Sequence, residues 1–379
     1  ILVIQTLSSP KGLLANYTQL LASPLTFELL RNSLFFAVGT TLLTFLIGVG
    51  LAILLVRTNC PFRNLFFTFS LIPMIIPAIL FNISWIYLLS PRIGIINSIL
   101  RYAGIQSPFN IFSFPGMIFV ESLYLSPIVF LLMAATFRSI DPSLEEAAIV
   151  SGATVSQCFF RVTLPLAFPG LASAGLITFV RALEAFETPA ILGLPAKIEV
   201  FTSRIYMALN TYPQDIGLVS SYAMVLILFT SIGVYLISVL SRQDKKYATI
   251  TGKGYRPHLI DIGRWKYLAG GGLLVYFFMM VGLPIVLLVW SSLQPYYSVP
   301  TIQALPKISI KNYSYVFSHP MIRQSLINSL ILALSSATAV MLLCSIVGWI
   351  VVKTKVPGRW FLDNLVTLPI VFPGLVIGV

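Results

Sequence analysis

The sequence predicts an all-α protein that crosses a membrane several times. The chain is 57% hydrophobic and only 9% charged, whereas soluble domains carry roughly 25% charged residues. Several apolar runs reach the about 20 residues that a helix needs to cross a bilayer. No run shows the alternating pattern of a membrane-spanning strand, and hydrocarbon offers no partner to an open backbone. Each run is therefore expected to be a helix in a polytopic bundle.

Apolar stretches of spanning length follow one another along most of the chain. They run over Ser33–Val56, Leu65–Leu89, Pro115–Phe137, Pro169–Glu187, Gly217–Leu240, Tyr267–Trp290, Leu326–Val352 and from Phe361 to the end. The first residue is Ile1 rather than Met, and the last lies inside an apolar run. We therefore expect a fragment that is truncated at both ends.

The formal net charge of +12 is explained by membrane topology and does not indicate nucleic-acid binding. Lys and Arg fall mainly in short loops between the apolar stretches. They are densest in Arg57–Asn64, Arg138–Leu166, Ser241–Lys266 and Lys353–Trp360. The positive-inside rule places these loops in the cytoplasm.

An internal repeat divides the chain into two similar parts. In constant register, Pro10-Lys11 recurs as Pro306-Lys307, Asn16-Tyr17 as Asn312-Tyr313, the NSL at Asn32 as the NSL at Asn328, and Pro61 as Pro357. Both copies place their basic turn on the same side, so the repeat is parallel, with its axis along the membrane normal. The expected domains are a first half at 1–241 with its transmembrane core at 33–240, a basic cytoplasmic linker at 242–266, and the start of a second half at 267–379.

A polar interruption, RSIDPSLEEAAIVSG, predicts a short helix on the cytoplasmic side. Asp141 or Ser143 can cap it, and Ser143-x-x-Glu146 matches a capping box. Pro142, Glu145 and Glu146 suit its first turn. Gly152 can take the left-handed conformation that ends it, which gives a helix of roughly ten residues and about 15 Å. A second turn is expected to follow before Leu164-Pro165 redirects the chain into the next span.

This helix is too short to be stable alone in water, so it must pack on something. The residues leave two interpretations open. It is either a surface helix lying on its own protein, or a helix that docks in a groove of a cytoplasmic partner. In the second case Ala147 and Ala148 would allow close approach and a glutamate would find a basic counterpart.

The same residues carry a family resemblance. Glu146-Ala147-Ala148, three residues, Gly152, nine residues and then Val162-Thr163-Leu164-Pro165 resemble the EAA loop of the permease subunits of type I binding-protein-dependent ABC importers. Val162 in place of Ile is the one departure. The resemblance covers the whole chain and implies two permease halves of six spans each, fused in one polypeptide of the bacterial inner membrane. A second EAA loop would lie beyond Val379.

The resemblance implies that the loop at 138–166 couples the permease to an ATP-hydrolysing subunit, with Glu146 and Gly152 as its most sensitive positions. The residues assigned to this coupling are Glu145, Glu146, Ala147, Ala148, Gly152, Leu164 and Pro165. The implied assembly adds two copies of an ABC ATPase subunit, a periplasmic or lipid-anchored substrate-binding protein, and membrane lipid.

The chain itself is not expected to be an enzyme. It contains no Walker A motif, GxGxxG motif or metalloprotease helix. ATP and Mg²⁺ are therefore expected on the partner ATPase, and no cofactor on this chain. Cys60, Cys158 and Cys344 lie far apart without a CxxC pair, so neither a disulfide framework nor a thiol-ligated metal site is indicated.

Four ionisable residues fall inside the predicted spans, where a charge costs about 2.5 to 3.5 kcal/mol near the centre. They are Glu121, Arg181, Glu184 and Glu187. Arg181 and Glu184 are three residues apart, so mutual neutralisation on one helix face is the simpler interpretation. The alternative is that Glu121, Glu184 and Glu187 line a path for a cationic substrate.

Paired prolines mark the second span of each half. Pro73 and Pro77 recur as Pro369 and Pro373, and each removes a backbone hydrogen bond, so both helices are expected to kink. The kinks either serve packing or form a hinge near the translocation path.

The substrate is the least constrained prediction. The segments LEAFETPAILGLPAKIEVFTSRIY and YATITGKGYRPHLIDIGRW resemble the ferric-iron transport group, which implies iron(III), free or chelated. Permeases for thiamine, phosphonates and polyamines are similar in architecture and remain alternatives. Two other classes also remain open from the sequence: an ion-coupled secondary transporter, and a membrane scaffold that transports nothing.

Overall fold

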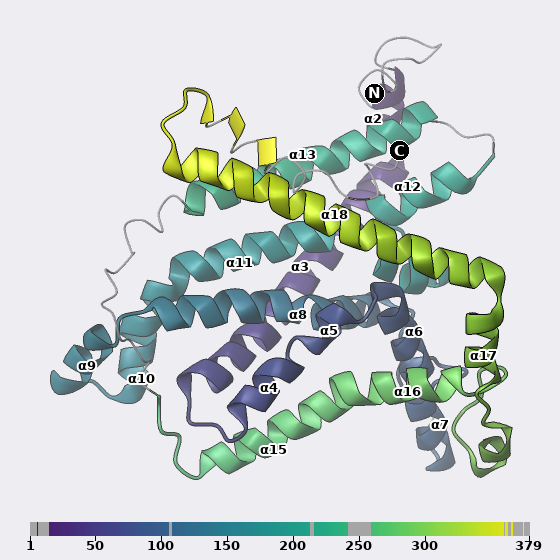
Figure 1. Cartoon of the computed structure of the whole chain (residues 1–379), viewed down its shortest axis with the longest axis horizontal. Coiled ribbons are helices and arrows are strands. Elements are labelled where there is room, and N and C mark those ends of the chain that lie inside the picture. Colours follow the sequence, from purple (N-terminus) through teal and green to yellow (C-terminus); the bar gives the residue numbers. More distant parts are fainter. Residues whose placement is uncertain are drawn as a thin grey trace. The chain divides into compact units, whose positions relative to one another are not determined.

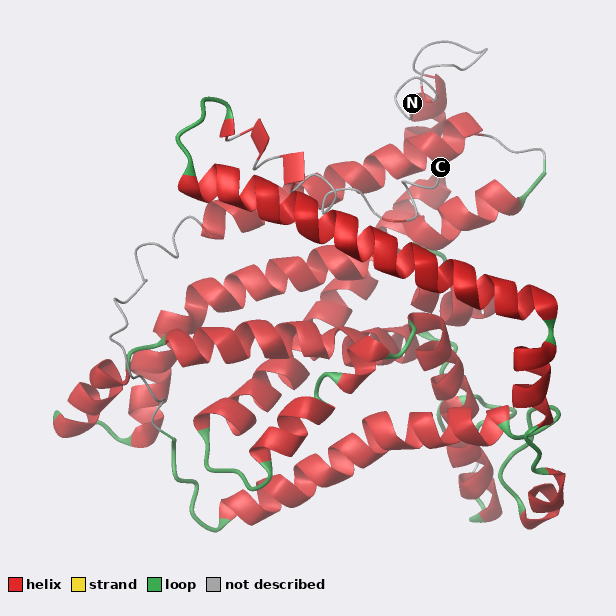
Figure 2. Ribbon diagram, viewed as in Figure 1, coloured by secondary structure: helices red, strands yellow, loops and turns green. Residues whose placement is uncertain are grey.

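The computed structural model describes Thr6, residues 15–105, 108–212, 216–241 and 259–359, and the single positions Phe361, Leu362, Leu365, Val366 and Gly374. These residues form helices and no strand (Figures 1 and 2). The helices divide into two compact units, the first reaching Ile285 and the second beginning at Val286.

The first unit contains most of the helices. In chain order they are α2 (Ala15–Ala22), α3 (Pro24–Ala52), η1 (Ile53–Arg57), α4 (Arg63–Phe69), α5 (Ile72–Ile75), α6 (Ala78–Leu89), α7 (Ile95–Tyr102), α8 (Phe114–Ser139), α9 (Pro142–Val150), α10 (Val155–Cys158), η2 (Phe159–Thr163), α11 (Leu164–Glu184), η3 (Pro189–Gly193), η4 (Leu194–Ala196), α12 (Phe201–Asn210), α13 (Ile216–Ser241), α15 (Trp265–Phe277) and η5 (Phe278–Gly282). Helix α16 (Leu283–Ser292) crosses the boundary between the units. The second unit contains η6 (Ile302–Lys307), α17 (Lys311–Ser318) and α18 (Pro320–Lys353).

The prediction of an all-α membrane fold is confirmed. Among the described residues, six helices are long and apolar enough to cross a membrane, and a bent pair of helices raises that number to seven. They correspond to the apolar stretches from Ser33 to Val352. The stretch that begins at Phe361 lies almost wholly outside the described residues.

Helices α3, α8 and α11 form the centre of the first unit. Small residues on α3 let α8 approach closely: a Cβ added to Gly48 would lie 2.7 Å from Val129 Cβ and 3.0 Å from the Phe130 nitrogen. Such small-residue contacts and interhelical hydrogen bonds hold helices together in lipid. One of these bonds runs from Ser122 Oγ to the Thr40 carbonyl oxygen at 3.1 Å.

The second span is broken and not merely kinked. The segment Arg63–Ile75 meets α6 at a bend of 101°. Pro77 disfavours helical geometry in the residue before it, and Ile76 accordingly takes an extended conformation with φ −75° and ψ 128°. Pro77 and the residues after it then start the new helix α6.

The internal repeat is visible in the local structure of both units. An eight-residue helix precedes each long helix, α2 before α3 and α17 before α18, and a proline occupies the first turn of each long helix. At the far ends, Thr58 and Thr354 take nearly the same extended backbone, with φ −119° and −113°. Each threonine hydroxyl donates to the carbonyl oxygen four residues earlier at 2.6 Å. The repeated sequence therefore encodes the same element twice.

The boundary between the compact units does not coincide with the boundary of the sequence repeat. Helix α15, which belongs by sequence to the second half, packs within the first unit. Its Phe277 ring stacks on Phe66 of α4 with ring centroids 5.6 Å apart, and a Cβ on Gly270 would lie 2.7 Å from Pro61 Cγ. The apolar face of α15 is thus buried against the other half's α4.

Replacing Gly48 with alanine should destabilise the protein, whereas the same change at Gly50 should not. The Gly48→Ala methyl group would push α8 away, at a cost of about 1–3 kcal/mol for overpacking. This exceeds the about 1 kcal/mol that alanine adds to helix stability. A Cβ at Gly50 would meet open space, so Gly50→Ala should gain helix stability without the cost of overpacking. Thermal unfolding in detergent should show a lower midpoint for Gly48→Ala than for Gly50→Ala, and equal midpoints would contradict the packing argument.

Candidate functional site

Helix α9 projects beyond the bundle where α8 ends, next to α10 (Figure 1). It is nine residues long. Asp141 caps its first turn, because its carboxylate accepts the Ser143 N–H at 2.9 Å, and Pro142 occupies the first helical position. The prediction that Ser143 and Glu146 form a capping box is wrong, because Asp141 is the residue that caps the helix. The Glu146 side chain is exposed.

Gly152 terminates the helix as its sequence position suggests. Its φ is +92°, a conformation that glycine adopts without the penalty that a Cβ brings. The Ala153 N–H then closes back on the Ala148 carbonyl oxygen at 3.0 Å. The following turn, α10, starts with a capping box between Thr154 and Gln157. The chain thus reverses direction within a few residues.

The inner side of α9 is fixed by Glu145. This side chain is 6% exposed and forms an ion pair with Arg57 at the end of η1, whose side chain is 1% exposed. Thr163 of η2 donates its hydroxyl to the same Glu145 oxygen, Oε1, at 2.5 Å. Arg57 Nη1 also donates to the Phe137 carbonyl oxygen of α8 at 3.4 Å. One carboxylate therefore ties α9 to the ends of α3, α8 and η2.

Several other residues that the sequence predicts to couple to an ATPase lie on or just after α9, away from Glu145. Glu146, Ala147 and Gly152 are exposed, and Ala148 is partly exposed. Within the part of the chain that the structure describes, Glu146 takes part in no hydrogen bond or ion pair. Apolar side chains surround it: Val150 is 88% exposed and Val155 53% exposed. This face combines one free carboxylate with uncovered apolar surface.

Leu164 and Pro165 do not redirect the chain. Val155–Glu184 is one continuous helical span of 30 residues, in which η2 has the wider π-helical winding and the Leu164 N–H bonds back to Phe159. Pro165 lacks an N–H group, and wider turns are one way in which a helix accommodates this. The expectation that Leu164-Pro165 redirects the chain is wrong, because α10 and η2 continue directly into α11.

The end of the linker packs beside α9. Residues 242–258 of the linker lie outside the described residues, but Ile260 forms a parallel bridge with Thr58, and its N–H donates to the Arg57 carbonyl oxygen at 2.8 Å. The Asp261 carboxylate accepts the Gly263 N–H and the Asn59 amide. These bonds hold the pKa of Asp261 below its usual value.

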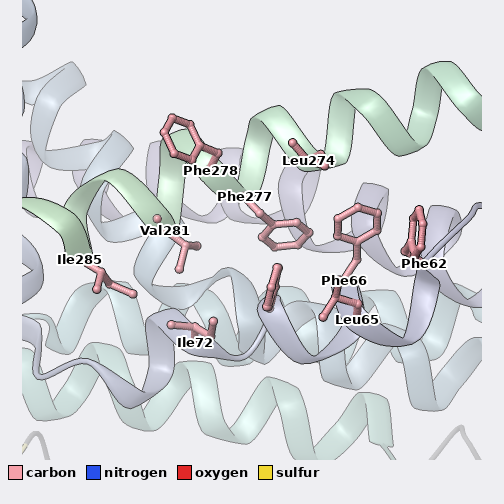
Figure 3. A pocket seen from close by; sticks show the side chains of 11 residues that line it. Phe62, Leu65, Phe66, Ile72, Leu274, Phe277, Phe278, Val281 and Ile285 are labelled. Carbon is pink, nitrogen blue, oxygen red and sulfur yellow. The ribbon is translucent and has the colours of Figure 1, made fainter.

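Two cavities of the first unit differ in chemistry. One, of about 390 Å³, lies beside α9, between this helix, α10 and the end of the linker. It is lined by the buried Arg57, Glu145 and Cys158, by the exposed Glu146, Ile149 and Val155, and by residues 259–261, among others. The other, of about 440 Å³, lies between α4–α5 and α15–η5 and is lined by apolar side chains alone, with Phe66 and Phe277 facing each other (Figure 3). The apolar cavity offers no group that could recognise an ion.

The four ionisable residues of the spans fall into two groups. Arg181 and Glu184 pair at 3.7 Å, and the other Glu184 oxygen, Oε1, is buried without a partner among the described residues. Glu121 is buried in α8, accepts a hydrogen bond from Thr188, and lies near enough to Glu187 for the two carboxylates to interact. Glu187 itself follows the end of α11. The described residues contain no cluster of three or more His, Cys, Asp or Glu that could hold a metal ion.

The prolines predicted to kink their helices can be placed in one half only. Pro73 is buried in α5 and Pro77 sits at the break before α6. Pro369 and Pro373 lie outside the described residues.

Sequence reasoning missed two residues of the site, Arg57 and Thr163. The sequence treats Arg57 only as a basic residue of a loop expected in the cytoplasm, and Thr163 only as one residue of the motif that ends at Leu164-Pro165. The available signal was position: a charged residue directly at the end of an apolar span needs a partner if the helix continues through it. Here η1 does continue to Arg57 and buries its side chain.

Comparison with solved structures agrees with this architecture. The chain aligns with a chain of a bacterial alginate ABC transporter, solved in complex with an alginate pentasaccharide-bound periplasmic protein, with a TM-score of 0.53 and 20% identity. The alignment covers 62% of this chain and 83% of that one. At this identity the likeness supports the fold alone.

Sequence relatives are transport permeases. The chain is 27% identical to the ferric transport system permease protein FbpB of Actinobacillus pleuropneumoniae over 93% of its own length, and spans 50% of that protein. It is 26% identical to the spermidine/putrescine transport system permease protein PotB of Escherichia coli, over 59% of this chain and 81% of PotB. The model of one family matches residues 44–248, which include the α9 loop. The chain belongs to the family of binding-protein-dependent transport system inner membrane components.

Proposed function

We propose that the chain is the permease of an ATP-driven importer, in which separate ATPase subunits dock on α9 and a separate binding protein delivers the substrate. The observation that carries this proposal is the two-sided build of α9. Its inner carboxylate, Glu145, forms an ion pair with Arg57 of the same chain. Its outer face leaves Glu146 and the apolar Val150 uncovered, as a surface that receives a partner would.

The docking partner is expected to present a groove with a basic rim. Short amphipathic helices bind by placing apolar side chains in a groove, while a charged residue beside them sets orientation. Val150 and Ile149 supply the apolar side chains, and Glu146 supplies the charge. ATP and Mg²⁺ would then be bound by two copies of the partner, and this chain would contribute no catalytic residue.

The proposed substrate is iron(III) or its chelates. This substrate is supported by the similarity to the ferric permease FbpB, which extends over 93% of the present chain and 50% of FbpB. The carboxylates of Glu121, Glu184 and Glu187 would make the path attractive to cations without chelating them, since no metal-binding cluster is found in the described residues. A polyamine is the alternative, because it is also cationic and PotB is a relative.

An ion-coupled secondary transporter is the competing class. It would need no docking face on α9, and its uptake would follow an ion gradient. Uptake into vesicles that contain ATP but no ion gradient separates the two: the importer continues to transport, and the secondary transporter stops.

Replacing Val150 with aspartate should release the ATPase subunit. A charge at this 88% exposed position would have to be buried without a partner in the docked complex. We expect about tenfold weaker capture of the ATPase, equivalent to about 1.4 kcal/mol, when the affinity-tagged permease is purified from cells that express the whole system. Tyr102→Asp is the control, because Tyr102 is about equally exposed, at 91%, but ends α7. This helix lies between the second and third apolar stretches, on the side opposite the basic loops that the positive-inside rule places in the cytoplasm. Equal capture by both variants would argue against docking on α9.

Replacing Glu184 and Glu187 with glutamine should lower uptake of radiolabelled iron(III) at least about threefold, because the path loses negative charge that attracts cations. Capture of the ATPase should not change. Glu199→Gln is the matched control, since Glu199 is also ion-paired, to Arg204 at 3.4 Å, and lies outside the helices of the path. Normal uptake by the Glu184→Gln, Glu187→Gln double variant would remove these residues from the path.

A further inference from the structure

We propose that Glu145 is the joint through which movement of α9 reaches the transmembrane helices, with Arg57 and Thr163 as its positioning partners. This inference rests on the proposed function and divides the two adjacent glutamates by role. Glu146 would belong to the outer docking face, and Glu145 to force transmission within this chain.

The geometry concentrates the connection on a single atom. Glu145 Oε1 accepts both the Arg57 guanidinium and the Thr163 hydroxyl. These two partners belong to η1, which extends α3, and to η2, which leads into α11. A displacement of α9 that keeps these bonds must therefore move the ends of both spans.

Burial makes the connection stiff. Both charged side chains are almost fully buried, so a separated pair would leave a poorly compensated charge. Thr163 is likewise 1% exposed. A second guanidinium nitrogen, Nη1, donates to the Phe137 carbonyl oxygen at the end of α8. The lowest-energy response to a push on α9 is movement of the helices together.

The chain contains a native reporter for this joint. Cys158 is 5% exposed, lines the cavity beside α9, and its sulfur lies 3.8 Å from the Glu145 carbonyl oxygen. A thiol reagent should reach this nearly buried sulfur faster when α9 moves away from the core. Its rate of modification therefore measures how firmly the joint holds.

The first experiment measures modification of Cys158 by a maleimide in inside-out membrane vesicles, read by peptide mass spectrometry that separates it from Cys60 and Cys344. Glu145→Gln should raise the rate about tenfold or more. Glu146→Gln, its neighbour on the outer face, should leave the rate within about twofold. Equal rates in both variants and in the unaltered protein would overturn the proposal.

A milder variant keeps the test decisive if Glu145→Gln does not accumulate in the membrane. Thr163→Val removes one hydrogen bond from the same oxygen and nearly preserves volume, and should raise the rate about threefold. An unchanged rate for Thr163→Val in that case would also overturn the joint.

The second experiment separates a joint from a purely structural role. In proteoliposomes that contain the permease, its ATPase and its binding protein, with iron(III) as the probe, Glu145→Gln should retain ATP hydrolysis but import at least about fivefold less iron per ATP. A folding defect would reduce hydrolysis and import in proportion, and that result would reject the joint. If the unaltered permease captures no ATPase, the proposed function fails, while the Cys158 measurement still reports whether Glu145 fixes α9.

Discussion

The burial of one charge pair governs the arrangement of the end of the bundle that carries α9. Arg57 and Glu145 are withdrawn from water, and removing either partner of such a pair costs about 3–5 kcal/mol. Because each charge needs the other, α9 has one position relative to α3, and the chain reversal at Gly152 then brings Thr163 to the same carboxylate. The outward direction of Glu146 follows directly, since neighbouring residues on a helix point about 100° apart.

A second constraint comes from the lipid environment. Hydrocarbon offers no hydrogen-bond partners, so helices are stable there when they pack closely and satisfy their own polar groups. The hydroxyls of Thr41, Thr136 and Thr178 donate to carbonyl oxygens four residues earlier in their own helices. The backbone does open at Ile76–Pro77. In this region Pro73 and Pro77 each lack a backbone N–H group, so two hydrogen-bond donors are absent from the start. The break thus costs fewer hydrogen bonds than it would at other residues.

The spans and the α9 loop could be predicted from the sequence because each depends on local patterns. Apolar length located the membrane helices, and the order of Asp141, Pro142 and Gly152 located both ends of α9. The Arg57–Glu145 pair could not be predicted, because 88 residues separate its members and no spacing rule connects them. The effect of Pro165 was predicted wrongly for a related reason. A proline inside a helix that has a wider turn before it cannot be distinguished by sequence from a proline at a change of chain direction. The bend at Pro77 was located correctly but its size was not, because 101° depends on how α6 packs.

The backbone pairing of Ile260 with Thr58 means that the peptide connection through residues 242–258 is not the sole tie between the start of α15 and the loop after α3. A chain cut within that connection would keep its two pieces in register through the Asn59–Asp261 contact and the stacked rings of Phe66 and Phe277.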